Sequence, residues 1–313
     1  MSENSALKAD YFVYGANSGV ELFLPQFMAS LLRNKYPKAT ISSAARRYKY
    51  FAGRCNAAVA LEHHSGDFLG VIFYETPYKI GELSYPYNTI NSTNINHALI
   101  EIATDECLKA GAVSSRIERQ LILNHEAVDE AADAGYFCQK RYRMTLEQEE
   151  KPSEYLPPAG VNLRSVSVKF VEETVDLLLS ANLNTKDAEM FYPLLSEREH
   201  CKNWLLRVLS GVYGTFLSAS RLAFRGNDII GVCLVIELDE DVAGIMEISV
   251  AHEMRGRGVG MSLMSKSLQL LHDDGYDTVD LSVTVGNDNA FHIYKKLNFK
   301  ETGMYTVCYR GYE

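Results

Sequence analysis

The sequence of 313 residues has no run of about 18 consecutive apolar residues, the length that a membrane-spanning helix needs. Its first ten residues are polar and lack the basic and then apolar pattern of a secretory signal. Basic residues are outnumbered, 31 Lys and Arg against 40 Asp and Glu, which gives a formal net charge of -9. A nucleic-acid binder usually carries the opposite balance. We therefore expect a cytoplasmic protein without a membrane or a nucleic acid as partner.

Closely spaced cysteines are absent as well, and there is no Cys-x-x-Cys pair for zinc or redox chemistry. Four of the six cysteines lie in apolar segments, a pattern typical of buried free thiols. We expect reduced thiols and no metal site. The six are Cys55, Cys107, Cys138, Cys201, Cys233 and Cys308.

The clearest change in composition divides the chain near its midpoint. The segment TLEQEEKPSEYLPPAG, residues 145–160, holds three of the eight prolines, and proline cannot serve in a central strand. We expect a first domain over residues 1–147, a linker over 148–160 and a second domain over 161–313. Each half has β-rich runs, amphipathic helices and a late helix between strands. The predicted fold class is mixed α/β, with two tandem domains, each a mostly antiparallel twisted sheet flanked by helices.

The two halves also resemble each other at a near-constant offset. Residues 97–111 match residues 261–275 when shifted by 164, and both predicted helices end at a glycine. Few residues are identical, so two readings stay open: a duplicated domain, or two α/β domains that share a helix length.

A glycine-rich turn in the second half carries the strongest chemical signal. The segment VAHEMRGRGVG, residues 250–260, follows an expected strand over 243–250 and opens an expected helix over 258–274. Glycines let backbone N–H groups approach a ligand, and the helix N-terminus adds partial positive charge. Together with two arginines, this predicts a pyrophosphate site. The spacing fits neither a Walker loop nor a dinucleotide fingerprint.

This turn resembles the coenzyme A loop of the GNAT acetyltransferase superfamily, and NDNAFHIYKKLNF, residues 287–299, resembles the second signature of that family. The resemblance covers residues 161–313 well and extends over 10–147 only as a degenerate echo, as in tandem-GNAT proteins. It implies that acetyl-coenzyme A is the cosubstrate. It also implies that the acetyl group is transferred to a primary amine of a small molecule or peptide by direct attack. The positions implied for binding acetyl-coenzyme A are Ser249, Val250, Arg255, Gly256, Arg257, Gly258, Val259, Gly260, Met261, Asn287, Asn289 and Ala290.

The same resemblance implies that Tyr294 is the acid that protonates the departing thiolate. The general base is less clear, because the family's carboxylate on the next strand is replaced here by Ser282. Glu247 is the candidate on the strand before the loop, although alternation places it on the opposite face from Val250 unless a bulge intervenes. Glu237 and Asp239, the two histidines His252 and His292, and a relay through water are the other options.

The first half lacks these parts. The 164 shift places Asn91, Asn94 and Asn96 where the loop has Arg255, Gly258 and Gly260, and Tyr294 falls on Ala131 under a 163 shift. We expect this domain to be catalytically empty and to form one wall of the substrate cleft. The expected protein is an N-acetyltransferase, as a monomer or homodimer. The alternative is a non-catalytic acyl-coenzyme A sensor or partner-binding module.

Overall fold

The computed structural model describes residues 11–16, 19–119 and 127–312. Contacts divide the chain into two compact units, which are residues 1–138 with 306–313 and residues 139–305. The domain limits expected from the sequence remain a prediction. None of the described helices is long and apolar enough to cross a membrane.

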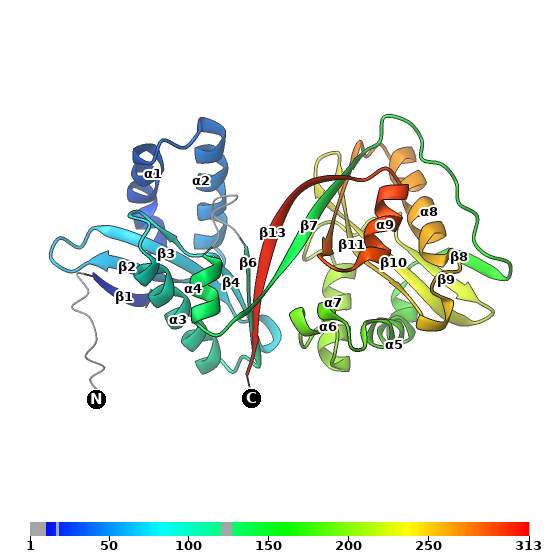
Figure 1. Cartoon of the computed structure of the whole chain (residues 1–313), viewed down its shortest axis with the longest axis horizontal. Coiled ribbons are helices and arrows are strands. Elements are labelled where there is room, and N and C mark those ends of the chain that lie inside the picture. Colours follow the sequence, from blue (N-terminus) through cyan, green and yellow to red (C-terminus); the bar gives the residue numbers. More distant parts are fainter. Residues whose placement is uncertain (1–10, 17–18, 120–126, 313) are drawn as a thin grey trace. The chain divides into compact units, whose positions relative to one another are not determined.

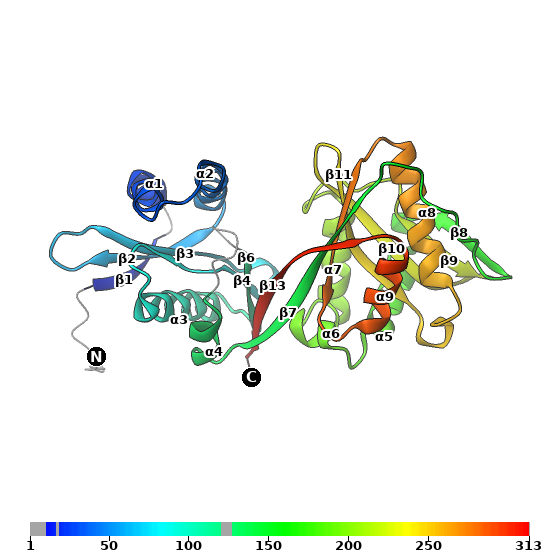
Figure 2. The same cartoon turned by 45° about the horizontal axis from the view of Figure 1, so that its top comes forward.

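The first unit is a twisted sheet with helices on both faces (Figures 1 and 2). Alternate residues of its central strands feed two separate cores: one includes Ala57, Val59 and Val71 with α1 and α2, and the other includes Ala58 and Ile72 with α3 and α4. The period of two along each strand therefore fixes which helices cover which face. The elements before the second unit are β1 (Tyr11–Ala16), α1 (Leu24–Arg33), α2 (Lys38–Ala52), β2 (Asn56–Glu62), β3 (Phe68–Glu75), β4 (Ile80–Ser84), β5 (Tyr87–Asn88), α3 (Thr93–Lys109), β6 (Ser114–Arg119) and α4 (Val128–Asp133).

The second half of the chain has a similar order of strands and helices. The elements from β7 onward, of which β7 and β13 belong only in part to the second unit, are β7 (Phe137–Glu147), β8 (Val161–Ser165), α5 (Val171–Asn182), α6 (Lys186–Met190), α7 (Arg198–Leu209), β9 (Arg221–Arg225), β10 (Asp228–Asp239), β11 (Val242–Val250), α8 (Val259–Asp273), β12 (Thr278–Thr284), α9 (Asp288–Lys296) and β13 (Lys300–Gly311). Strand β10 is buried from Ile230 to Ile236 because both faces are covered. The mixed α/β class expected from the sequence is confirmed.

Strand β9 begins only at Arg221, because residues 214–220 form turns and one isolated bridge from Phe216 to Ile236. The last strand, β13, begins at Lys300.

The final strand of each half of the sequence completes the sheet of the other half. Residues 141–147 of β7 pair antiparallel with 278–284 of β12, and residues 308–311 of β13 pair antiparallel with 114–117 of β6. This exchange explains why each compact unit draws residues from both halves of the sequence.

The segment expected as a linker has no helix or strand between residues 148 and 160, but it is held along α8. Ser265 Oγ donates to the Ser153 carbonyl (2.8 Å) and accepts from the Tyr155 amide (2.9 Å). Lys151 pairs with Asp273 at 2.6 Å near the end of the helix. The helix that follows the glycine-rich turn is therefore fixed along its length.

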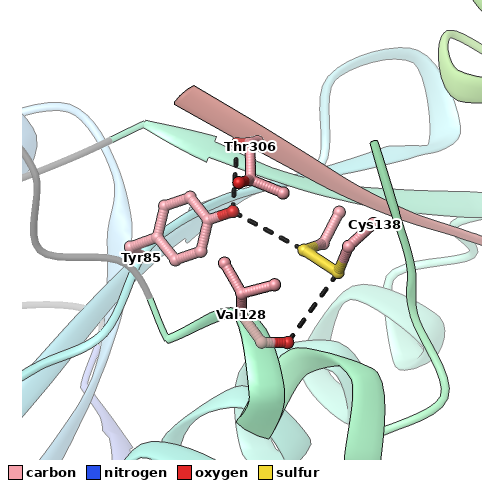
Figure 3. Close-up of a disulfide and its surroundings, with 5 residues drawn as sticks. Tyr85, Val128, Cys138 and Thr306 are labelled. Carbon is pink, nitrogen blue, oxygen red and sulfur yellow. Dashed lines mark hydrogen bonds between the residues drawn. A yellow bond between two sulfur atoms is a disulfide. The ribbon is translucent and has the colours of Figure 1, made fainter. Parts of the chain in front are cut away.

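Cys138 and Cys308 form a disulfide within the first unit, which corrects the expectation of free thiols for this pair (Figure 3). They are 170 residues apart, and the pairing of β13 with the first unit brings them together. Tyr85 donates its hydroxyl proton to the Thr306 carbonyl beside them (3.0 Å). The other cysteines, Cys55, Cys107, Cys201 and Cys233, are free.

We expect the unfolded, unreduced protein to show four thiols that react with Ellman's reagent, and six after reduction. Cys138→Ser should lower the free energy of unfolding by up to about 5 kcal/mol, because the bond closes a long loop in the unfolded chain. Cys55→Ser is the control, since Cys55 is not disulfide-bonded. Six reactive thiols before reduction would contradict the disulfide.

Candidate active site

Strands β11 and β12 pair only where they begin. The parallel register joins residues 242–244 to 278–280, and the described residues show no pairing between the two strands beyond that point. Every residue from Ile245 to Ile248 is only partly buried, although β11 lies inside the sheet. We call residues 245–250 and 281–284 of these strands the β11–β12 divergence. It exposes backbone hydrogen-bonding groups that a regular sheet would use internally.

A β-bulge precedes Glu247 on β11. Residues 234 and 235 of β10 lie opposite Glu247 and Ile245, which leaves Met246 as an extra residue. Because the bulge lies before Glu247, alternation is regular from Glu247 onward, and Glu247 and Ser249 share one face of the strand. Val250 lies on the other face, as simple alternation predicts.

The backbone of Val250 points into the divergence. The Ala251 amide donates to the Ile230 carbonyl on β10. Because antiparallel strands alternate their bonding direction, the Ser249 amide is turned toward β10. The amides of Ile248 and Val250 are turned toward β12. Of the two positions on β11 implied for binding acetyl-coenzyme A, Val250 therefore has its amide on the side of β12, whereas the amide of Ser249 is turned toward β10.

The glycine-rich turn leaves open space beside its backbone. Gly256 and Gly258 have φ of +71° and +88°, which glycine adopts without strain. A Cβ at either position would meet no atom within 4 Å. Gly258 is the N-cap of the 15-residue α8, so free N–H groups and the helix dipole favour a phosphate here. The backbone of Gly256 and Gly258 therefore leaves room for a phosphate, and the cofactor-binding roles of Val259 and Met261 remain predictions.

The two arginines of the turn differ in their contacts. Arg255 donates from Nε to the Val250 carbonyl (3.2 Å) and from its terminal nitrogen to the Ala181 carbonyl at the end of α5. Arg255 therefore ties α5 to β11. Arg257 is exposed, so it is the arginine whose whole charge is available to an anion.

The second signature forms the turn and helix that were expected. The Asn287 side chain caps α9 by accepting from the Ala290 amide (3.3 Å), and Asn289 is exposed in the first turn. His292 is also exposed, and its Nδ1 lies 2.6 Å from the Asp288 carbonyl. This contact places His292 on the outer face of the helix.

Tyr294 lies on the inner face of α9 and is 5% exposed. In the described part of the chain, no protein group hydrogen-bonds its hydroxyl. Burial raises the pKa of Tyr294, and the charge of Glu247 raises it further. The phenol therefore stays protonated at neutral pH, and the charge of Glu247 is one of the causes.

Glu247 is partly buried beside this phenol. Ser249 Oγ donates to its Oε1 (2.6 Å) and accepts from Asn182 Nδ2 (3.3 Å). Burial raises the pKa of Glu247 to about 7; the bond from Ser249 opposes this shift and the charge of Asp187 adds to it. A carboxyl with a pKa near neutrality is suited to accept and return a proton.

The first unit uses its corresponding turn differently. Asn88 Oδ1 accepts from the amides of Ile90 and Ser92, and its Nδ2 donates to Asn96 Oδ1 (2.7 Å). Asn96 in turn donates to Glu130 (2.9 Å). Side chains thus occupy the turn's N–H groups, and a carboxylate lies near the helix start, where it would repel phosphate.

Comparison with known proteins agrees with this geometry. Residues 181–299 match the model of the Acetyltransferase (GNAT) family. These residues form a GNAT acetyltransferase domain. The match contains β11, the glycine-rich turn, α8, β12 and α9, and therefore the whole of the arrangement described above.

The curated relatives of this GNAT domain match over short stretches. An uncharacterised N-acetyltransferase from Methanocaldococcus jannaschii is 41% identical over 61 residues, which is 20% of this chain and 27% of that protein. A mycothiol acetyltransferase from Tsukamurella paurometabola is 46% identical over 54 residues, 17% of this chain and 18% of that protein. The chain thus spans well under half the length of either relative.

Two solved structures share the fold over nearly the whole chain. A GCN5-related N-acetyltransferase from Sphaerobacter thermophilus has a TM-score of 0.66 at 14% identity and covers 98% of this chain and 97% of that one. A tandem GNAT protein from the clavulanic acid biosynthesis pathway has a TM-score of 0.57 at 13% identity, with 96% and 98% covered. This chain therefore shares its fold with a known tandem GNAT structure.

Several residues of the site have no motif that would mark them in the sequence. Asn182 and Asp187 come from α5 and α6, Arg141 from β7 and Thr284 from the end of β12. Arg141 donates to the Ser282 carbonyl (3.2 Å), at the position where the sequence lacks the expected carboxylate. Asn182, Asp187 and Arg141 affect the pKa of Glu247, and Thr284 donates to Asp187. Only the fold brings these residues together. Among the described residues, no group of three or more His, Cys, Asp or Glu is arranged to hold a metal ion.

Proposed function

We propose that this GNAT domain transfers the acetyl group of acetyl-coenzyme A directly to a primary amine. The observation that carries the proposal is the place of Glu247 on β11 at the β11–β12 divergence, where its charge acts on Tyr294 and a glycine-rich turn suited to pyrophosphate follows. Acetyl-coenzyme A is held with its pyrophosphate at 256–260 and its pantetheine arm along the backbone of β11.

The reaction needs one base and one acid. The amine nitrogen attacks the thioester carbon while Glu247 accepts a proton from that nitrogen, directly or through water. The negative charge on the carbonyl oxygen is stabilised by the Val250 amide. The carbon–sulfur bond then breaks, and Tyr294 gives its proton to the coenzyme A thiolate. Transfer of the proton from Glu247 to the tyrosinate restores both side chains.

The two proton transfers are linked by charge. The negative charge of Glu247 is one cause of the raised pKa of Tyr294. When Glu247 takes the amine's proton, that charge disappears, and Tyr294 becomes a stronger acid at the stage when the thiolate leaves. Each transfer therefore favours the next.

Calorimetric titration with acetyl-coenzyme A tests the cosubstrate. We expect one site per chain with a Kd on the order of micromolar, and loss of binding in Gly258→Glu, because the new side chain adds negative charge at the phosphate site and strain at a positive φ. Gly226→Glu is a matched control, since Gly226 also has a positive φ and open space but lies in the β9–β10 turn. Two sites would show that the first unit binds acetyl-coenzyme A as well.

Release of coenzyme A with a panel of amines then separates the two functions considered. Turnover with any primary amine supports the acetyltransferase. Binding of acetyl-coenzyme A without turnover of any amine would favour the non-catalytic sensor.

A further inference from the structure

The segment between α5 and α6 reaches both of the strands that diverge. At its start, Asn182 Nδ2 donates to Ser249 Oγ on β11 (3.3 Å). At its end, the Thr284 hydroxyl of β12 donates to Asp187 Oδ1. Residues 182–187 therefore span the β11–β12 divergence and place Asp187 at its edge.

Only one carboxylate oxygen of Asp187 accepts a hydrogen bond from the described residues. Oδ1 accepts from the buried Thr284, and among the described residues Asp187 makes no ion pair. The side chain is partly exposed. Its negative charge raises the pKa of both Glu247 and Tyr294, the two residues proposed to move protons.

The guanidinium of Arg141 lies in the same neighbourhood but is engaged elsewhere. It donates to the Ser282 carbonyl and lies 4.9 Å from the centre of the Phe191 ring. The site thus contains two carboxylates, and the proposed reaction uses only Glu247. The attacking nitrogen must be neutral when it reacts, so the carboxylate that the proposed reaction does not use, Asp187, is suited to bind a different, cationic nitrogen of the acceptor.

We propose that Asp187 binds a second ammonium group of the acceptor, so that the substrate class is amines with at least two cationic groups. This rests on the proposed acetyltransferase function. One nitrogen lies beside Glu247 and attacks the thioester, while the other is held by a charge-assisted hydrogen bond from its N–H to the free oxygen of Asp187. An acceptor with a carboxylate in place of the second ammonium is repelled.

The test compares diaminopentane, pentylamine and aminopentanoate, which share a chain length and differ in the charge at the far end. We expect the wild type to prefer diaminopentane over pentylamine by about 10- to 100-fold in kcat/KM, the usual range for a hydrogen bond to a charged group. Asp187→Asn keeps an oxygen that accepts from Thr284 and should abolish this preference, mainly by raising the KM for diaminopentane. Asp187→Glu should retain part of the preference.

Glu189→Gln is the matched control, because Glu189 lies on the same helix and is exposed; its preference should equal that of the wild type. A second readout is the pH profile of kcat: Asp187→Asn should move its acid limb to lower pH, because a negative charge near Glu247 is removed. The titratable and charged groups near Glu247 are Asp187 of α6, Arg141 of β7, Tyr294 of α9, Cys201 of α7 and Cys233 of β10.

Equal kcat/KM for diaminopentane and pentylamine in the wild type would overturn the role of Asp187, whatever the variants do. Retention of the preference in Asp187→Asn would do the same. If no amine is acetylated although acetyl-coenzyme A binds, the proposed function fails and this proposal falls with it. Turnover of pentylamine without a diamine preference removes the role of Asp187 alone.

Discussion

Replacing Glu247 by glutamine is expected to lower kcat by about 100- to 1,000-fold, the usual contribution of a general base. The amide keeps the shape of the carboxyl and still accepts the hydrogen bond from Ser249, but it does not take the amine's proton. Affinity for acetyl-coenzyme A should stay within about twofold, because the pyrophosphate and pantetheine contacts come from other residues. Steady-state kinetics and calorimetry on the same preparation measure the two quantities.

The raised pKa of Glu247 predicts how kcat depends on pH. Glu247 must be deprotonated to act, and its pKa is raised to about 7. The wild-type kcat should therefore fall about tenfold per unit as the pH drops below 7, and Glu247→Gln should lack this limb. Glu237→Gln is the control on the neighbouring strand, where Glu237 lies opposite Ala243, at the far end of β11 from Ser249. Wild-type turnover by Glu247→Gln would assign the proton to another acceptor.

As the pH rises, the free energy of unfolding should fall while kcat rises. The pKa of Glu247 rises from 4.5 in the unfolded chain to about 7 in the folded protein, so the folded state holds a proton that the unfolded state has lost. The free energy of unfolding falls as the pH rises from about 4.5 to 7 and then levels off. At pH 8 the cost is at most about 3 kcal/mol. Glu247→Gln removes it, and its Tm should exceed that of the wild type at pH 8 but not at pH 4.

The glycine-rich turn and the Tyr294 helix could be predicted from the sequence because each depends on neighbours along the chain. Glycine is needed where φ is positive, as at Gly258, and asparagine caps the helix that follows, as at Asn287. Patterns of this kind are local, so spacing alone places them on the correct elements.

The rest of the site depends on contacts between distant segments. Nothing near Glu247 in the sequence reveals the bulge at Met246, because a bulge is a mismatch in length between two strands. Asp187 and Arg141 lie 60 and 106 residues before Glu247, on a short helix and on a strand that the sequence assigns to the first half. The disulfide between Cys138 and Cys308 follows from the same exchange of strands. Hydrophobic periodicity predicts elements, and it carries no information about which distant elements pair.

Replacing Tyr294 by phenylalanine is expected to lower kcat by about 100-fold, because the coenzyme A thiolate then leaves without a proton donor. The ring remains to pack against Phe299, whose centre lies 6.0 Å away, so the fold and the affinity for acetyl-coenzyme A should be retained. Burial and the charge of Glu247 keep the pKa of the phenol well above its usual value. The wild-type kcat should therefore show no fall at alkaline pH up to about pH 10 that is due to this residue.

Tyr142→Phe is the matched control for this loss. Tyr142 packs its ring against Phe291, one turn earlier on the same helix, with ring centres 5.0 Å apart. A loss of kcat in Tyr294→Phe but not in Tyr142→Phe assigns the effect to one hydroxyl rather than to the position of α9. If Tyr294→Phe keeps the full kcat while Glu247→Gln loses it, the thiolate takes its proton from water, and the link between the two proton transfers through the charge of Glu247 is not part of the mechanism.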